Sequence, residues 1–315
     1  ALVRPELDPL SGLLAHADAA GADLLDGICV AQLPHRPGAV TVRRVVTVLK
    51  YLSLVAGATV ALLPLLVIFS TSFKTGEEFD RGEPLALPGS LLNLDNYYVA
   101  FTDGHMLLAF LNTAIILLVS VTGTVIIGSM AAYALSRFDF RMKKPVLFLF
   151  LLATLVPPVT QQVATFQVIS ALGLFNTRWA AIVLFMGTDI VSIYIFLQFL
   201  RTIPRALDEA AVLDGASYTR IYWQIILPLM KPAIATVVII KSVAIYNDFY
   251  TPFLYMPNKD ELGVVSTVLF SFKGPFNTEW EVIAAAIVIA IVPTLVAFLA
   301  LQRYIYSGLT TGATK

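Results

Sequence analysis

Three charged side chains interrupt the long apolar stretches of this sequence: Asp189, Lys241 and Asp248. A charge at the centre of a bilayer costs about 2.5–3.5 kcal/mol on insertion scales, so each of the three requires a partner or a function. Opposite charges at similar depth could form an ion pair. A chain of them could relay protons or ions, or they could border a polar path.

The side-chain patterns of common catalytic sites are missing. The sequence has no Gly-Lys dipeptide and no G-x-S-x-G, which excludes the usual phosphate-binding loop and the hydrolase nucleophile turn. Its one cysteine, Cys29, and its three scattered histidines, His16, His35 and His105, supply no metal-binding pair. The sequence therefore predicts no metal site and no enzyme activity, and indicates a physical task such as passage or coupling.

The composition is that of a membrane protein with several spans. Of the 315 residues, 58% are hydrophobic and 13% are charged, against about 25% charged in soluble domains. The formal net charge is zero, so nothing indicates a nucleic-acid partner.

Six apolar segments are long enough to cross a bilayer as helices, which takes about 20 residues each. Continuous rather than alternating apolar runs predict an all-α fold. The segments are 51–73, 106–135, 145–166, 179–200, 233–256 and 282–304.

Lys and Arg lie mostly on one side of these segments, which predicts that this side and both termini are cytoplasmic. Fifteen of the 21 fall there: Arg4, Arg36, Arg43, Arg44, Lys50, Arg137, Arg141, Lys143, Lys144, Arg201, Arg205, Arg220, Lys231, Arg303 and Lys315.

Asp189 and Lys241 lie at similar depth in segments four and five. Asp189 is about 16 Å and Lys241 about 12 Å from the inner ends of their helices, at 1.5 Å per residue. We therefore predict an ion pair between them. It could be structural, or it could break and re-form between two conformations of the protein.

Polar and aromatic groups further out could border a polar path through the membrane. Asp248, Asn247, Tyr246 and Tyr250 offer the aromatic faces and planar hydrogen-bonding groups that suit sugars, although Asp248 could instead cap or kink the helix. A second pair of candidates, Gln161 and Gln162, follows the double proline 157–158, which breaks the helical hydrogen-bond ladder. Cavity lining and plain helix packing remain alternatives for these two glutamines.

Between segments four and five lies a half-polar stretch that predicts a helix-turn-helix on the inner membrane face. Thr202 is expected to cap the first helix and Gly215 to end it in the left-handed conformation. Ser217 is expected to cap the second helix and Pro228 to stop it. An ordinary interfacial helix that binds lipid headgroups is the alternative.

The spacing in this stretch closely resembles the EAA loop of ABC importer permeases, E-A-A-x3-G-x9-I-x-L-P. "YNDFYTPFLY" resembles the W-N-D/E-F-x-x-P segment of sugar-importer permeases, with Tyr246 in place of tryptophan, and "FLNTAIIL", "MAAYALSRFDF" and "LQRYIYSGLTTGATK" also match. The resemblance covers about residues 45–315 and is to the second permease of the maltose-type carbohydrate-uptake family. The EAA pattern is filled by Glu209, Ala210, Ala211, Gly215, Ile225, Leu227 and Pro228.

The resemblance implies a six-helix permease whose loop 201–232 couples to a cytoplasmic ATPase. ATP and Mg would bind to that ATPase, and this chain would bind no cofactor. The implied partners are a second homologous permease, two copies of the ATPase, an extracytoplasmic sugar-binding protein and membrane lipid, in a bacterial-type inner membrane. A sugar or oligosaccharide is the implied substrate. A glycerol-phosphate-type substrate, an ion-coupled transporter and a non-transporting scaffold remain alternatives.

The domain organisation expected from the sequence has two parts. Residues 1–40 match no family pattern and are expected to form a weakly ordered cytoplasmic extension. Residues 41–315 form the transmembrane domain.

Overall fold

The computed structural model describes residues 38–82, 85–187, 189–274 and 278–311, in two units, Ala1–Leu63 and Pro64–Lys315. The described part of the first unit is the beginning of helix α2 (Gly38–Thr71). Its apolar stretch Val46–Thr71 has 26 residues, about 39 Å of helix, which exceeds the roughly 30 Å of a bilayer's hydrocarbon core. The extension predicted for residues 1–40 lies outside the described residues, except that 38–40 begin α2.

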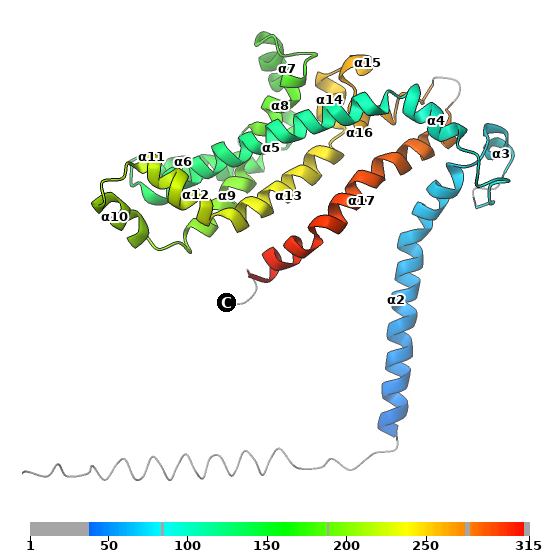
Figure 1. Ribbon diagram of the computed structural model, residues 1–315, viewed down its shortest axis with the longest axis horizontal. Coiled ribbons are helices and arrows are strands. Elements are labelled where there is room, and N and C mark those ends of the chain that lie inside the picture. Colours follow the sequence, from blue (N-terminus) through cyan, green and yellow to red (C-terminus); the bar gives the residue numbers. More distant parts are fainter. Residues whose placement is uncertain (1–37, 83–84, 188, 275–277, 312–315) are drawn as a thin grey trace, which may run out of the picture. The chain divides into compact units, whose positions relative to one another are not determined.

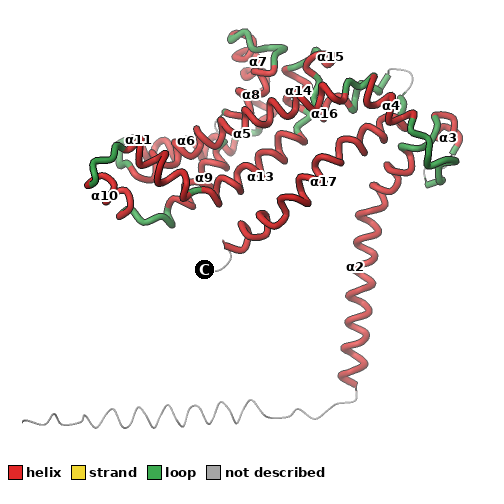
Figure 2. Tube along the Cα trace, viewed as in Figure 1, coloured by secondary structure: helices red, strands yellow, loops and turns green. Residues whose placement is uncertain are grey.

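The described residues form helices and loops; the only strand-like feature among them is an isolated bridge between Lys273 and Thr278 (Figure 2). Besides α2, the elements are α3 (Gly76–Arg81), α4 (Asp95–Thr102), α5 (Met106–Arg137), α6 (Lys143–Leu155), the 3-10 turn η1 (Pro158–Gln161), α7 (Gln162–Ala171), α8 (Arg178–Met186), α9 (Ile190–Leu200), α10 (Ala206–Leu213), α11 (Tyr218–Ile221), the π-helical turn η2 (Tyr222–Ile226), α12 (Leu227–Leu229), α13 (Lys231–Asn247), α14 (Tyr250–Tyr255), α15 (Lys259–Leu262), α16 (Val265–Val268) and α17 (Trp280–Thr311).

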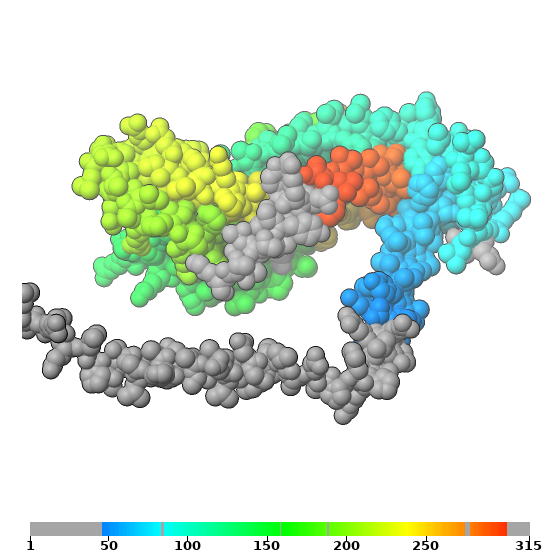
Figure 3. Space-filling view, turned by 60° about the horizontal axis from the view of Figure 1, so that its bottom comes forward, coloured from blue at the N-terminus to red at the C-terminus, as the bar shows by residue number. Residues whose placement is uncertain are grey.

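Helix α5 is the central element of the second unit, and α8, α9 and α13 pack along it (Figure 1). Its 32 residues contain no proline, so the hydrogen-bond ladder is unbroken. Small residues let α9 approach closely: a Cβ added at Gly128 would lie 3.3 Å from the Phe196 ring. A buried cluster joins the last turns of α5 to α9, α10, α11 and α13. In Figure 3 the residues of α10, α11 and α13 form the yellow-green lobe.

Four helical stretches are long and apolar enough to cross a membrane, or up to six if each of two bent pairs counts as one span. The four are Val46–Thr71, Met106–Arg137, Arg178–Leu200 and Trp280–Ala300, which correspond to the first, second, fourth and sixth predicted segments. The third and fifth predicted segments are not continuous helices, and the fourth is interrupted between α8 and α9.

The third segment bends by 98° between Lys143–Leu155 and Val159–Ala171. Pro157 and Pro158 lie at the bend, and neither has a backbone N–H to continue the ladder. The Pro157 carbonyl instead accepts from the N–H and the hydroxyl of Thr160, at 3.1 and 2.7 Å. The double proline therefore ends one helix and starts another in a new direction, where a kink would only bend a single helix.

The fifth segment ends early, at Asn247, and is bent by 73° relative to the hairpin stretch Tyr218–Leu229 before it. Asp248 starts a separate helix, α14, because its carboxylate accepts from the N–H of Thr251 at 2.8 Å and from the Thr251 hydroxyl at 3.3 Å. A side chain that satisfies the first N–H groups of a new helix competes with continuation of the old one.

At the end of α5 away from the hairpin, a fully buried amide joins three elements. Asn112 Oδ1 accepts from Arg178 Nε of α8 at 2.8 Å, while its Nδ2 donates to the carbonyls of Glu261 and Gly263 at 3.0 and 2.9 Å. The hydroxyl of Thr113 accepts from the N–H of Val265 at 3.1 Å. The "FLNTAIIL" segment thus fixes the loop between α14 and α16.

Candidate functional site

The half-polar stretch between α9 and α13 folds as the predicted helix-turn-helix. Gly215 has φ +80°, the left-handed conformation, and no neighbouring atom would meet a Cβ there, so the backbone angle alone requires glycine. Ser217 caps α11 by accepting from the N–H of Arg220 at 3.3 Å. The turn between the two helices is therefore held by the residues that the sequence indicated.

Two predicted boundaries of the hairpin are wrong. Thr202 does not cap the first helix, because its hydroxyl donates to the carbonyl of Phe199 at 2.7 Å and closes the end of α9. α10 begins only at Ala206, after Pro204. Nor does Pro228 stop the second helix, which continues to Leu229 through the π-helical turn η2. In that turn the N–H of Leu227 bonds to the carbonyl of Tyr222, five residues back, in the widened ladder of a π-helix.

The residues of the EAA pattern divide between the core and the surface. Ala211 is buried in the core cluster, and Ile225 and Leu227 pack against it. Glu209, Ala210 and Pro228 are exposed. Ala211, Ile225 and Leu227 therefore hold the hairpin in place, and Glu209 is exposed.

A buried residue that the sequence analysis did not single out anchors the hairpin. Asp208 Oδ2 lies 3.0 Å from Arg137 Nε at the end of α5, with side-chain exposures of 12% and 7%. The angle between the Arg137 N–H and the Asp208 oxygen does not fit a hydrogen bond, so the contact is an ion pair. Tyr133 donates to Asp208 Oδ1 at 3.2 Å, and Arg137 Nη2 donates to the Ile203 carbonyl at 3.0 Å. α5 therefore holds both ends of the segment that leads into α10.

The second helix of the hairpin is attached to the same part of α5. The hydroxyls of Ser129 and Tyr222 lie 2.8 Å apart, and the rings of Tyr133 and Tyr222 pack at a centroid distance of 5.5 Å. The last turns of α5 therefore contact both helices of the hairpin.

The outward face of the hairpin carries exposed apolar side chains around an acidic group. Leu213 is 89% exposed, and Val212 and Tyr218 are also exposed. With Glu209 they line a surface cavity of about 410 Å³, whose lining also includes Tyr133, Arg205 and the Asp208–Arg137 pair. Exposed apolar residues beside charged ones are typical of a protein interaction site.

The structure brings Asp189 and Lys241 together. Lys241 Nζ lies 3.3 Å from Asp189 Oδ2, each side chain is 16% exposed, and the Ser192 hydroxyl also donates to Asp189 Oδ2. Asp189 stands in the break between α8 and α9, so the pair joins this break to α13.

We expect that Asp189→Asn and Lys241→Met each lower the amount of assembled complex, because loss of one partner of a buried pair costs about 3 kcal/mol. The double variant should recover part of the loss, since no unpaired charge remains. The measurement is the complex recovered after detergent extraction and its thermal midpoint. Lys231→Met is the control, because Lys231 is an exposed cation on the same helix. Additive damage in the double variant contradicts the pair.

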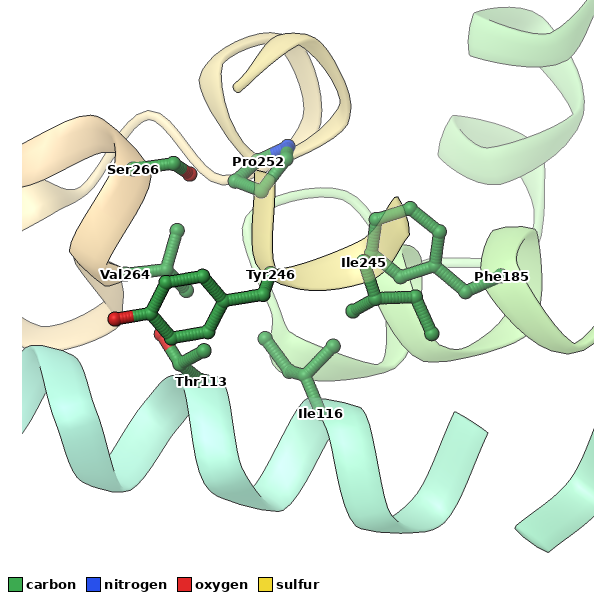
Figure 4. Close-up of a pocket in the computed structure, with 8 residues that line it drawn as sticks. All are labelled: Thr113, Ile116, Phe185, Ile245, Tyr246, Pro252, Val264 and Ser266. Carbon is green, nitrogen blue, oxygen red and sulfur yellow. The ribbon is translucent and has the colours of Figure 1, made fainter. Parts of the chain in front are cut away.

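Tyr246 does not face a sugar-sized space in this structure. Its hydroxyl donates to the Ala290 carbonyl of α17 at 2.7 Å, and its ring lies among Thr113, Ile116 and Val264 (Figure 4). The cavity there is about 10 Å³, which is about the space of one water molecule.

The remaining path candidates are spread over two places. Tyr250 donates to Gln162 Oε1 at 2.8 Å, so α14 and α7 meet there, and both side chains are exposed or half-buried. Asn247 donates to the Val243 carbonyl of its own helix, Asp248 caps α14, and Gln161 lies 3.5 Å from the Val156 carbonyl. Of the six candidates, Tyr250 and Gln162 are the two that a hydrogen bond joins.

Nothing in the described part of the chain gathers the side chains of a metal site. No group of three or more His, Cys, Asp or Glu residues lies close enough to hold an ion among those residues. His16, Cys29 and His35 lie outside them.

The chain is similar to known proteins along most of its length. Residues 124–311 match the family model of the binding-protein-dependent transport system inner membrane component. The chain is 34% identical over 278 residues to the probable starch degradation products transport system permease protein AmyC of Thermoanaerobacterium thermosulfurigenes, which covers 86% of this chain and 99% of that one. It is 32% identical over 257 residues to the melibiose/raffinose/stachyose import permease protein MelC of Bacillus subtilis (strain 168), over 80% and 91% of the two chains.

The fold has a solved counterpart. A chain in the crystal structure of a bacterial ABC transporter involved in the import of the acidic polysaccharide alginate superposes with a TM-score of 0.73 at 22% identity, over 87% of this chain and 99% of that one. The matched family range contains the hairpin, its Arg137 anchor and the intramembrane pair. The chain therefore belongs to the family of binding-protein-dependent transport system inner membrane components, the membrane-spanning permeases of ABC importers.

Proposed function

We propose that this permease carries a sugar or oligosaccharide and that its hairpin, within loop 201–232, docks on the ATPase that drives import. The family assignment places it as a multi-pass inner-membrane component that works with an ATPase and a binding protein. The observation that carries the docking proposal is the hairpin itself: an exposed acidic and apolar face on α10, held from behind by the buried Asp208–Arg137 pair.

The substrate proposal rests on what the relatives are named for. AmyC is named for starch degradation products, MelC for melibiose, raffinose and stachyose, and a third relative, MalD of Streptococcus pneumoniae (strain ATCC BAA-255 / R6), 30% identical over 87% of this chain, for maltodextrin. All of these are carbohydrates. Tyr246, Asn247, Asp248, Tyr250, Gln161 and Gln162 remain the proposed path residues.

The assembly we propose contains this chain, a second homologous permease, two copies of the ATPase and an extracytoplasmic sugar-binding protein. Both termini and the hairpin lie on the cytoplasmic side, and residues 41–315 form the transmembrane domain. ATPase closure and reopening push the hairpin, which moves the last turns of α5 and switches the access of the path.

Uptake by a reconstituted complex tests this proposal. The complex is reconstituted in vesicles, with the binding protein outside and ATP inside, and screened with labelled oligosaccharides. The vesicles should accumulate maltotriose, raffinose or another oligosaccharide. Accumulation should need ATP and survive ionophores that collapse proton and sodium gradients. If the vesicles take up glycerol phosphate and no sugar, the substrate is a glycerol phosphate and the sugar proposal is wrong. Uptake driven by an ion gradient without ATP contradicts the coupling proposal.

A further inference from the structure

A larger cavity lies between α6 and α9, next to the one that Glu209 lines, and the two share Arg137 and Arg205 in their linings. Its volume is about 600 Å³, within the 300–1,000 Å³ of small-molecule sites. Basic side chains surround one part and apolar side chains the other. The residues that line it are Leu135, Ser136, Arg137, Lys143, Leu147, Leu151, Tyr194, Leu197, Arg201, Ile203, Pro204 and Arg205.

The basic part carries more positive charge than its neighbours neutralise. Arg137 is paired with Asp208, and Lys143 lies 2.9 Å from Asp139. Arg205 donates to the carbonyl of Ser136 at 2.9 Å, which has no full charge. Among the described residues, neither Arg205 nor Arg201 has a carboxylate within ion-pair distance. The four cations therefore exceed their paired carboxylates by two.

The apolar part continues along transmembrane helices. Leu147 and Leu151 lie one turn apart on α6, and Tyr194 and Leu197 face them from α9. The cations lie at the ends of these helices next to the hairpin, on the side that the distribution of Lys and Arg predicts to be cytoplasmic. The cavity is thus positive at the membrane surface and apolar toward the bilayer.

From this arrangement we infer that the cavity binds an anionic phospholipid of the inner leaflet. The phosphate of the headgroup lies between Arg201 and Arg205, whose planar groups can each donate two parallel hydrogen bonds to it. An acyl chain lies against Leu147, Leu151 and Leu197. Basic pockets between helices on the cytoplasmic side are a known form of anionic lipid recognition. A soluble phosphate compound would use the basic part and leave the apolar wall uncovered.

Native mass spectrometry of the intact complex, with the full chain, tests this inference. Delipidated complex is titrated with dioleoylphosphatidylglycerol, dioleoylphosphatidylcholine or soluble glycerol phosphate. We expect phosphatidylglycerol to bind at least tenfold more tightly than phosphatidylcholine, and glycerol phosphate not to compete at millimolar concentration. Arg201→Gln should weaken phosphatidylglycerol binding about tenfold, the effect of one hydrogen-bonded charge. Leu147→Trp should weaken it by filling the apolar wall.

Lys144→Gln is the matched control, because Lys144 is exposed beside Lys143 and does not line the cavity. It should change the affinity less than twofold. Equal loss in Lys144→Gln and Arg201→Gln shows that phosphatidylglycerol binds the general surface charge and overturns the inference. Unchanged binding in both Arg201→Gln and Leu147→Trp, or equal binding of the two lipids, overturns it too. Competition by glycerol phosphate assigns the cavity to a soluble anion instead. None of these outcomes depends on which substrate is transported.

Discussion

Arg137→Leu is expected to lower substrate-stimulated ATP hydrolysis and uptake at least tenfold while leaving membrane insertion unchanged. The substitution leaves Asp208 buried without its cation, and breaking a buried ion pair costs about 3–5 kcal/mol. It also removes the donor to the Ile203 carbonyl, so α10 loses two of its attachments to α5. The contacts of Ser129 and Tyr133 with the hairpin remain, but less of the hairpin's movement then reaches α5. The readouts are co-purified ATPase, stimulated hydrolysis in vesicles, and uptake.

A double variant and a neighbouring cation serve as rescue and control for this prediction. Arg137→Leu combined with Asp208→Leu should regain part of the activity, because no unpaired charge stays buried. Arg141→Leu removes an exposed cation four residues away and should change little. Wild-type hydrolysis and uptake in Arg137→Leu would show that the ion pair does not position the hairpin.

Glu209→Lys and Gly215→Val are expected to abolish coupling from the opposite, outward side of the hairpin. Glu209 is exposed beside Val212 and Leu213, so charge reversal turns an attraction for a basic partner group into repulsion. A charged hydrogen bond contributes about 1.5–3 kcal/mol, so docking of the ATPase should weaken more than tenfold. A β-branched valine at φ +80° is strained, so Gly215→Val should misplace α11. Co-purification, stimulated hydrolysis and uptake should fall together.

Matched variants separate these effects from general damage. Gly173 also has positive φ, +68°, with open space around it, so Gly173→Val imposes the same strain outside the hairpin. Asp260→Lys reverses an exposed charge on α15. Both controls should keep the ATPase bound. If Glu209→Lys and Gly215→Val kept all three readouts at wild-type level, the hairpin would be an interfacial helix and the docking proposal would fail.

The sequence predicted the apolar helices well because hydropathy and length decide them. It placed the second segment at 106–135, and the structure has α5 at Met106–Arg137. It failed where a helix is interrupted locally, either by a competing hydrogen bond or by prolines without an N–H donor. Asp248 captures the Thr251 N–H and ends the fifth segment early, and the double proline before Gln161 bends the third segment by 98°.

The site was predictable only in the parts that sequence spacing encodes. Gly215 and Ser217 act through their own backbone and their nearest neighbours, so the pattern located them. Asp208 and Arg137 are 71 positions apart and meet only through packing of α10 on α5. Arg137 was counted simply as one of the cytoplasmic cations, although its place in "MAAYALSRFDF", a segment shared with the family, was a signal that it does more.

The unbroken ladder of α5 has a thermodynamic consequence for the two ends it joins. Asn112 and Arg137 are separated by about 38 Å of helix at 1.5 Å per residue, so a tilt of about 5° displaces one end by roughly 3 Å relative to the other. A ligand that favours one position of the loop held by Asn112 must then change the affinity of the hairpin for its partner. Linkage makes this coupling free energy reciprocal: the partner on the hairpin changes the affinity at the far loop by the same factor.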